Sequence, residues 1–240
     1  MQDWKKKHKQ VIEDFLKYLN SRTDDYVLKG GTSLMMCYGL DRFSEDIDLD
    51  STNKHAIKNI IDTFCKEHKY TYRIAKDTDT VKRYMISYDK NTENPKPLKI
   101  EVSYRKRQID RDDTVRINNI RVYNINNIAL MKANAYSNRD KIRDLYDVSF
   151  ICNNYFEELE KTTKKVLSGA LEYKGIEQYD VITRTQVDEL IDPDDLAEKF
   201  LLAWDKLELA ESPDNSPSLA KNRASRDKER EPAPEYMPGM

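Results

Sequence analysis

Apolar positions in the first half of the chain follow two different periods. Residues 4–20 predict a helix, because one apolar stripe recurs at helical spacing: Val11, Ile12, Phe15, Leu16 and Leu19. A second stripe of this kind predicts another helix: Ile57, Ile60, Ile61, Phe64 and Cys65. Short runs that favour strands occupy 26–29, 70–75, 81–89 and 98–105, with a weaker candidate at 116–123 and a Pro-containing hairpin loop at 91–97. We therefore expect a mixed sheet with flanking helices over residues 1–123.

From residue 124 onward the pattern is helical. Asn124 or Asn126 is placed to cap a first helix, Asp140 to cap a second, and residues 192–195 to begin a third that reaches residue 207. These signals predict a helical domain over 124–210, so the fold class is α+β. Residues 211–240 hold five of the eight prolines and few apolar side chains, which predicts a disordered tail.

The composition excludes several classes of protein. The chain has 240 residues, of which 38% are hydrophobic and 35% charged, and its longest apolar runs are too short to cross a membrane. Three widely spaced cysteines do not form a disulfide framework, and no secretion signal opens the chain. We expect a reduced, cytoplasmic protein with no membrane association.

Charge is nearly balanced overall but not locally. Lys and Arg number 41 against 43 Asp and Glu, which gives a formal net charge of −2. Between residues 99 and 143, however, 11 Lys or Arg face 5 Asp or Glu. A local excess of this kind can guide a polyanion to a protein that is close to neutral, although it is also compatible with a solvated surface.

A glycine turn follows the first predicted strand. Lys29, Gly30 and Gly31 precede Thr32 and Ser33, where a short helix over 32–38 is expected to begin, and we predict that these five residues bind the substrate. Free backbone N–H groups at such a helix start bind phosphate, and two hydroxyls lie beside them. Because glycine pairs also form ordinary turns, the segment alone is weak evidence for a phosphate site.

Carboxylates alternate with apolar residues at 46–50. Asp46 and Asp48 therefore point to the same face of a strand, where their like charges repel unless a cation lies between them. Oxygen ligands of this kind suit Mg²⁺ or Mn²⁺. Glu101, on the polar face of the strand at 98–105, would supply a third carboxylate to a two-metal site if the two strands are neighbours. The alternative is that the three carboxylates are ordinary residues on solvent-exposed faces of strands.

These motifs resemble those of the AbiEii/AbiGii toxin nucleotidyltransferases, within the polymerase-beta-like superfamily, over about residues 25–150. The matching features are Gly30-Gly31-Thr32, the Arg-Phe-Ser-x-Asp-Ile-Asp run that ends at Asp48, the Lys-Ile-Glu that ends at Glu101, and a basic and acidic helical segment with Lys132, Arg139, Lys141, Arg143, Asp144 and Asp147. The resemblance implies that Asp46 and Asp48 bind metal, that Glu101 is the third carboxylate, that Gly31, Thr32 and Lys132 contact the triphosphate, and that Asp144 and Asp147 form a later acidic motif.

Other interpretations of the helical residues stay open at this stage. Lys132 lies near an apolar stripe and could extend from a core helix to solvent, and an Arg143–Asp147 pair at i and i+4 would make Asp144 and Asp147 ordinary helix surface residues.

The expected activity is transfer of a nucleoside monophosphate from an NTP to an acceptor hydroxyl, with release of pyrophosphate. The acceptor is expected to be RNA, such as a tRNA 3′ end, and the resemblance implies a toxin with a cognate antitoxin. Transfer to a protein hydroxyl and a non-catalytic nucleotide-binding module are the alternatives.

Overall fold

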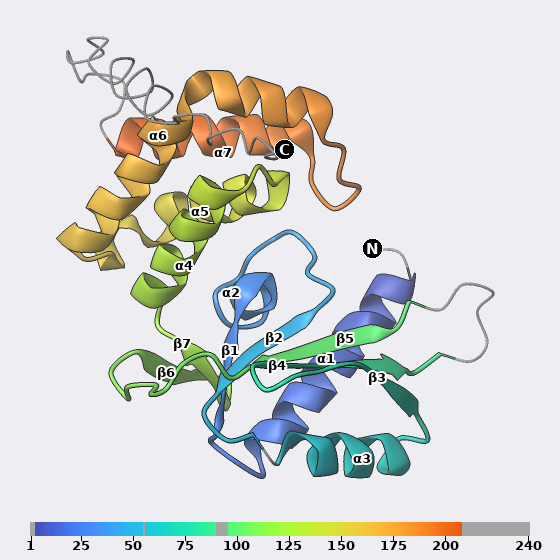
Figure 1. Ribbon diagram of the computed structural model, residues 1–240. Coiled ribbons are helices and arrows are strands. Elements are labelled where there is room, and N and C mark those ends of the chain that lie inside the picture. The colour runs from blue at the N-terminus through green and yellow to red at the C-terminus, as the bar shows by residue number, and fades with distance from the viewer. Residues whose placement is uncertain (1–2, 55, 90–95, 208–240) are drawn as a thin grey trace, which may run out of the picture.

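The computed structural model describes residues 3–54, 56–89 and 96–207 (Figure 1). Its sheet has seven strands in the order β3-β4-β5-β2-β1-β7-β6. The strands are β1 (Tyr26–Lys29), β2 (Ile47–Ser51), β3 (Thr71–Asp77), β4 (Val81–Ser87), β5 (Leu98–Ser103), β6 (Thr114–Ile117) and β7 (Ile120–Tyr123). The helices are α1 (Asp3–Asn20), α2 (Gly30–Cys37), α3 (Ile57–Glu67), α4 (Ile125–Asn138), α5 (Ile142–Tyr155), α6 (Lys161–Thr185) and α7 (Pro193–Lys206), with a short 3₁₀ turn at Phe156–Glu158.

The sheet is mixed, as the sequence predicts. β2 pairs with β5 and β1 with β7 in parallel, while the other neighbouring strands are antiparallel. The α+β fold class is therefore confirmed, with a helical part after the sheet. The division at residues 123 and 124 into two domains stays a prediction, and the tail expected over 211–240 lies outside the described residues, as does most of the loop expected over 91–97.

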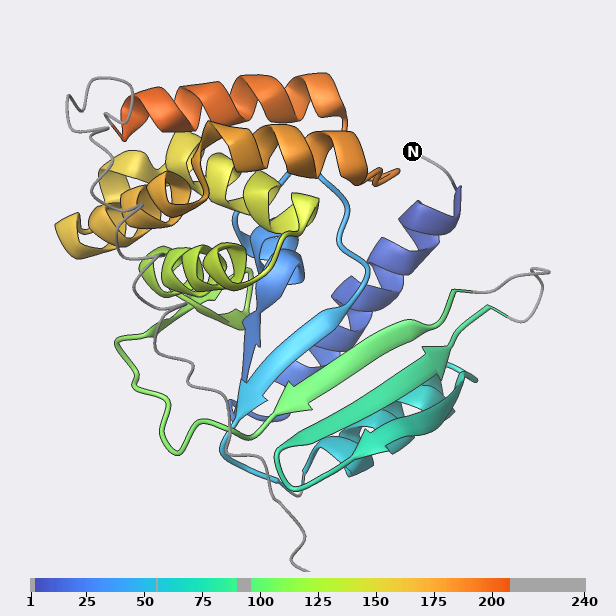
Figure 2. The same cartoon turned by 45° about the horizontal axis from the view of Figure 1, so that its top comes forward.

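The two faces of the sheet are covered differently. α1 and α3 pack on one face, where Phe15 and Phe64 contact each other edge to face at 5.2 Å between ring centroids. On the other face α2, α4 and α5 lie over the β2-β1-β7 side, with α6 and α7 stacked farther from the sheet (Figure 1). The same face of β5, β4 and β3 carries none of the helices that the structure describes (Figure 2).

One predicted strand is in fact a hairpin. The weaker candidate at 116–123 contains both the end of β6 and all of β7, which pair antiparallel. Asn118 and Asn119 connect them, both in the left-handed region with φ of 52° and 64°. Asparagine tolerates this conformation, and two consecutive left-handed residues make a turn whose twist suits a hairpin. The Asn118-Asn119 pair is therefore the sequence signal for this turn.

Helix capping was predicted correctly at one end and wrongly at another. Asn124 caps α4 and its side chain accepts a hydrogen bond from the backbone N–H of Asn127 at 2.9 Å. Asp140 does not cap α5, because Lys141 holds the N-cap position and makes no side-chain cap. The Gln186 side chain instead accepts from the backbone N–H of Ile142 at 3.0 Å, from 44 residues away in the chain.

None of the helices in the described part of the chain is long and apolar enough to cross a membrane.

Candidate active site

Three carboxylates lie near the place where β2 pairs with β5. Asp46 directly precedes β2, Asp48 lies within it, and the parallel register pairs Asp48 with Glu101. Paired residues of neighbouring strands lie about 4.8 Å apart and point to the same face. The strand adjacency that the sequence analysis required for a third carboxylate is confirmed.

Asp48 is the carboxylate that the protein leaves without a partner. No hydrogen bond or ion pair reaches its side chain from any residue that the structure describes. Burial raises the pKa of Asp48, the charges of Asp46 and Glu101 raise it further, and Lys99 and Lys29 oppose them. A partly buried carboxylate without a partner is unfavourable for the free protein, so the site favours a bound cation.

The other two carboxylates are paired with cations from β4 and β5. Lys99 Nζ lies 2.5 Å from Asp46 Oδ2, while Arg83 Nε and Nη2 lie 2.7 and 2.6 Å from Glu101 Oε2. Among the described residues, no three His, Cys, Asp or Glu side chains are grouped closely enough to hold a metal ion as they stand. The carboxylates have the oxygen donors that Mg²⁺ prefers. For all three to bind the ion, Asp46 and Glu101 must first separate from Lys99 and Arg83.

The third aspartate of the alternating run has a different role. Asp50 is buried, and it accepts from Lys29 Nζ at 2.5 Å and from the Tyr123 hydroxyl at 3.0 Å. The ammonium group of Lys29 is therefore bound to Asp50 on the neighbouring strand β2, although Lys29 was predicted to bind the substrate. It stands opposite Asp48 in the register of β1 and β2.

The glycine turn holds α2 against the strand of carboxylates. Gly30 has φ of +77°, and a Cβ built there would lie 3.0 Å from Asp48 Oδ2. At Gly31 a Cβ would lie 2.9 Å from both Arg42 Nη2 and Ser44 Oγ. Both positions thus require glycine for close approach, and Gly30 also requires it for its backbone conformation.

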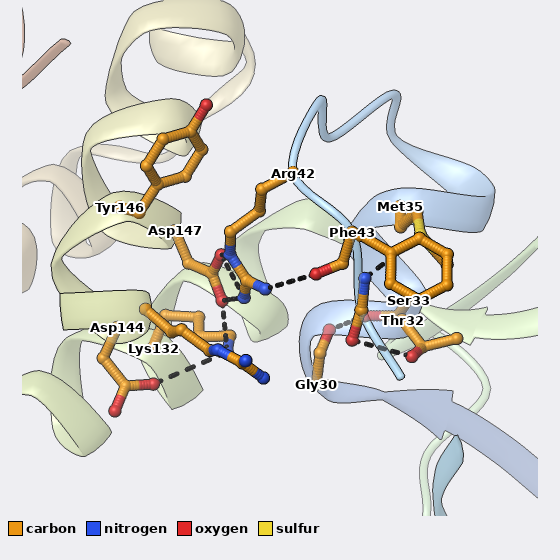
Figure 3. Close-up of polar contacts among 12 residues, drawn as sticks. Gly30, Thr32, Ser33, Met35, Arg42, Phe43, Lys132, Asp144, Tyr146 and Asp147 are labelled. Atoms are coloured by element: carbon orange, nitrogen blue, oxygen red, sulfur yellow. Dashed lines mark hydrogen bonds and ion pairs between the residues drawn. The ribbon is translucent and has the colours of Figure 1, made fainter. Parts of the chain in front are cut away.

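The hydroxyls beside the turn are used inside the protein. Thr32 donates to the backbone carbonyl of Asp46 and shares a hydrogen bond of 2.9 Å with the Ser44 hydroxyl. The Ser33 hydroxyl donates to the Gly30 carbonyl at 2.7 Å, and both Thr32 and Ser33 are buried (Figure 3). These side chains hold the loop that carries Asp46, which leaves the backbone N–H groups at the start of α2 to meet a phosphate.

A buried ion pair joins this loop to α5. Arg42 Nε and Nη2 each donate at 2.7 Å to one oxygen of Asp147, and Lys132 Nζ lies 2.5 Å from Asp147 Oδ2 (Figure 3). Arg42 is 5% exposed and Asp147 fully buried, so this bidentate pair positions the loop rather than contacting solvent. The role of Arg42 could not be predicted from the sequence, because its partner is 105 residues away.

Asp144 lies one turn before Asp147 and is one of the residues that line a pocket. Its carboxylate accepts from Arg139 Nε at 2.6 Å and from Arg139 Nη2 at 3.0 Å, and Lys132 Nζ is 3.6 Å away. Arg143 pairs with Asp188 and not with Asp147. The interpretation of Asp147 and Arg143 as an i,i+4 helix pair is therefore wrong, and that of Lys132 as a lysine reaching solvent does not fit its buried ion pair.

Two arginines bring positive charge from this pocket toward the carboxylates. The pocket has a volume of about 700 Å³ and is lined by Arg139, Lys141, Arg143, Thr185 and Gln186, among others. The hydrogen bond to Asp144 raises the pKa of Arg139, and the charges of Asp48 and Asp147 contribute to the rise. Arg143 Nη2 also lies 3.6 Å from Glu45 Oε2, and Glu45 directly precedes Asp46, so the pocket adjoins the carboxylates.

The comparisons with known proteins agree with this arrangement. Residues 14–233 match the family model described as nucleotidyl transferase AbiEii toxin of type IV toxin–antitoxin systems. The structure of JHP933 from Helicobacter pylori is similar with a TM-score of 0.70 and 25% identity, covering 96% of this chain and 100% of that one. A structure from H. pylori assigned as a nucleotidyltransferase has a TM-score of 0.70 and 27% identity, covering 88% and 99%. A search of curated protein sequences gives no match.

The family model spans the strand of carboxylates, the glycine turn and the helices that carry Lys132 and Asp147. The fold, the order of these motifs and the matched range lead to one conclusion: the chain belongs to the AbiEii family of nucleotidyltransferase toxins.

Proposed function

We propose that the protein transfers a nucleoside monophosphate from an NTP to a hydroxyl of an RNA acceptor, such as a tRNA 3′ end, in a reaction that requires Mg²⁺ or Mn²⁺. One observation carries the proposal: the unpartnered carboxylate of Asp48 lies near Asp46 and Glu101 and next to Gly30, at the start of α2. A cation bound there would relieve the repulsion and meet the phosphates of a nucleotide.

Asp46, Asp48 and Glu101 would hold the metal. When bound, it supplies Lewis acidity, which lowers the pKa of the acceptor hydroxyl and offsets the charge of the triphosphate.

The remaining steps fall to the chain's own residues. The backbone N–H groups of Gly30 and Gly31, at the positive end of α2, bind phosphate oxygens. Arg139 and Arg143 line the neighbouring pocket and stabilise the negative charge of the departing pyrophosphate. The acceptor oxygen forms a bond to the α-phosphorus as the bond to pyrophosphate breaks, and Glu101 accepts the hydroxyl proton.

Lys132, Asp144 and Asp147 act as positioning residues, because their charged groups are bound to one another and to Arg42.

The test uses purified protein with each α-³²P-labelled NTP, Mg²⁺ and total tRNA, and follows label into RNA and protein on one gel. We expect label in RNA, and a loss of at least 100-fold in Asp48→Asn, as is usual when a group that stabilises the transition state is removed. Asp205→Asn, an exposed aspartate on α7, is the matched control and should retain full activity.

The remaining outcomes separate the alternatives. Label only in protein would replace RNA with a protein hydroxyl as acceptor. NTP binding without metal and without transfer would identify a nucleotide-binding module and overturn the proposal. We also propose that a cognate antitoxin binds the protein, in keeping with its family, and that it acts in the cytoplasm, where NTP and tRNA are found.

A further inference from the structure

A row of charged side chains crosses the sheet from Asp48 to the edge strand, with two carboxylates followed by two cations. The register pairs Asp48 with Glu101, Glu101 with Arg83, and Arg83 with Lys76. Paired residues point to the same face, so the four side chains form one line over β2, β5, β4 and β3. The ion pair between Arg83 and Glu101 agrees with this placement.

A second row runs beside the first. Lys99 pairs with Met85, and Met85 pairs with Arg73 on the edge strand. The row begins at Asp46, whose carboxylate is bound by Lys99. Each row therefore starts at a carboxylate of the candidate active site and ends at a cation on β3.

The two outer cations differ from the two inner ones. Lys99 and Arg83 are paired with active-site carboxylates, whereas Arg73 and Lys76 are exposed and form no ion pair with any of the described residues. None of the described helices covers this part of the sheet, since α3 lies on the opposite face (Figure 2). The positive charge at the outer ends of both rows is thus accessible.

We propose that this surface, which we call the β3-β5 face and define by Arg73, Lys76, Arg83 and Lys99, binds the phosphate backbone of the RNA acceptor. The inference rests on the proposed function. Three strand spacings of about 4.8 Å separate β3 from β2, a span of about 14 Å. Stacked nucleotides rise about 3.4 Å each, so about four of them bridge the distance from Arg73 to the carboxylates. Contacts of this type bind phosphates without selecting bases.

The inner cations connect RNA binding to the metal site. Arg83 and Lys99 occupy carboxylates that a metal would need, and their long side chains are partly exposed. An RNA strand on the β3-β5 face offers them phosphates as alternative partners, which frees Glu101 and Asp46. Charged residues on an edge strand also serve to prevent pairing with other sheets. That role requires no RNA affinity, so the two explanations differ in a measurable quantity.

The experiment measures binding of 5′-fluorescein-labelled tRNA by fluorescence anisotropy, in EDTA without NTP, across a salt series. The variant Arg73→Gln/Lys76→Gln is compared with Lys58→Gln/Lys66→Gln, which removes the same charge from exposed positions of α3 on the other face. We expect the first variant to lower the slope of log K against log salt by about 1.4, since each single-strand phosphate contact contributes about 0.7. That slope corresponds to roughly 25-fold weaker binding at 0.1 M salt, relative to 1 M, where the electrostatic contribution vanishes. The α3 variant should bind as wild type does.

Equal effects of the two double variants, or no binding of tRNA by the wild-type protein, would overturn the inference. The proposed function is tested separately by labelling. If transfer to RNA proceeds and the KM for tRNA is unchanged in Arg73→Gln/Lys76→Gln, the β3-β5 face does not bind the acceptor, and the proposed function is unaffected. If Asp48→Asn and wild type bind tRNA through this face but neither transfers label, the face stands and the function fails.

Discussion

At the scale of single residues, the site depends on how closely the backbone of α2 approaches the carboxylates. Gly30 and Gly39 both have a positive φ, of +77° and +74°. They differ in surroundings, because a Cβ at Gly30 meets Asp48 Oδ2 at 3.0 Å and a Cβ at Gly39 meets nothing within 4 Å. The pair therefore separates backbone strain from contact with the site.

Gly30→Ala and Gly39→Ala should each lower the free energy of unfolding by about 1–2 kcal/mol, the strain of an L-residue in the left-handed region. Only Gly30→Ala should also lose transfer activity, because its methyl group displaces Asp48. Urea denaturation and the labelling assay measure the two effects. Full activity in Gly30→Ala would show that Asp48 tolerates displacement and that the glycine serves the backbone alone.

At the scale of elements, the Arg42–Asp147 pair connects the loop before β2 to α5. The local parts of this arrangement were predictable: the alternation around Ile47 and Leu49 gave the strand, and the alternation around Glu101 gave its neighbour. The connection was not, because nothing within a few residues of Arg42 indicates a partner 105 positions later. Periodicity reports which face of an element is buried, and not which buried charges meet.

Asp147→Asn should lower the free energy of unfolding by about 3–5 kcal/mol, since it leaves Arg42 and Lys132 buried without their shared carboxylate. Urea denaturation measures this change. Adding Arg42→Met to Asp147→Asn should recover part of the loss, because one of the uncompensated charges is then removed. A double variant as unstable as the sum of the single variants would mean that the two residues do not interact.

His8 makes a second connection between elements, from α1 to the segments that flank β2 and β4. Its Nε2 lies 2.7 Å from the Glu45 carbonyl and its Nδ1 lies 2.6 Å from the Tyr88 hydroxyl. These partners suit a neutral ring that donates through Nε2 and accepts through Nδ1. Burial lowers the pKa of His8, although the Glu45 carbonyl and nearby carboxylates oppose the effect.

The lowered pKa of His8 predicts a loss of stability in mild acid. The unfolded chain binds a proton at His8 below its pKa of about 6.5, whereas the folded protein keeps the ring neutral to lower pH. The contribution of neutral His8 to the free energy of unfolding is therefore complete above that pH and is lost as the pH falls. Urea midpoints at pH 7.5 and 5.5 should differ more for wild type than for His8→Gln. The same difference in both proteins would exclude His8 as the cause.

At the scale of the whole molecule, α5 makes polar contacts with the segment between α2 and β2. Besides Arg42–Asp147, the Tyr155 hydroxyl donates to the Tyr38 carbonyl at 2.5 Å, and the Tyr146 hydroxyl contacts Asp41 at 2.7 Å. A boundary can be drawn in the sequence at residue 123 because the period changes there. The period carries no information on how strongly the two parts depend on each other, and that dependence comes from side chains on α5.

We expect sheet and helices to unfold in one transition. The two tryptophans report on different parts, Trp4 on α1 and Trp204 on α7. Trp204→Phe and Trp4→Phe leave one reporter each, and their fluorescence midpoints in urea should coincide, as two-state unfolding requires. Midpoints that differ beyond the effect of each substitution on stability, measured by circular dichroism, would establish two independently stable units.

The unpartnered carboxylate of Asp48 has a consequence for the evolution of this protein. A group whose neutral form is favoured by its surroundings destabilises the folded state at neutral pH, so the residue that we propose to bind the metal is one that selection for stability alone would remove. Asp48→Asn should therefore melt at a higher temperature than the active protein. Inactive descendants of this protein would gain stability by losing this single charge. Position 48 is therefore where we expect the sequences of inactive copies to differ first.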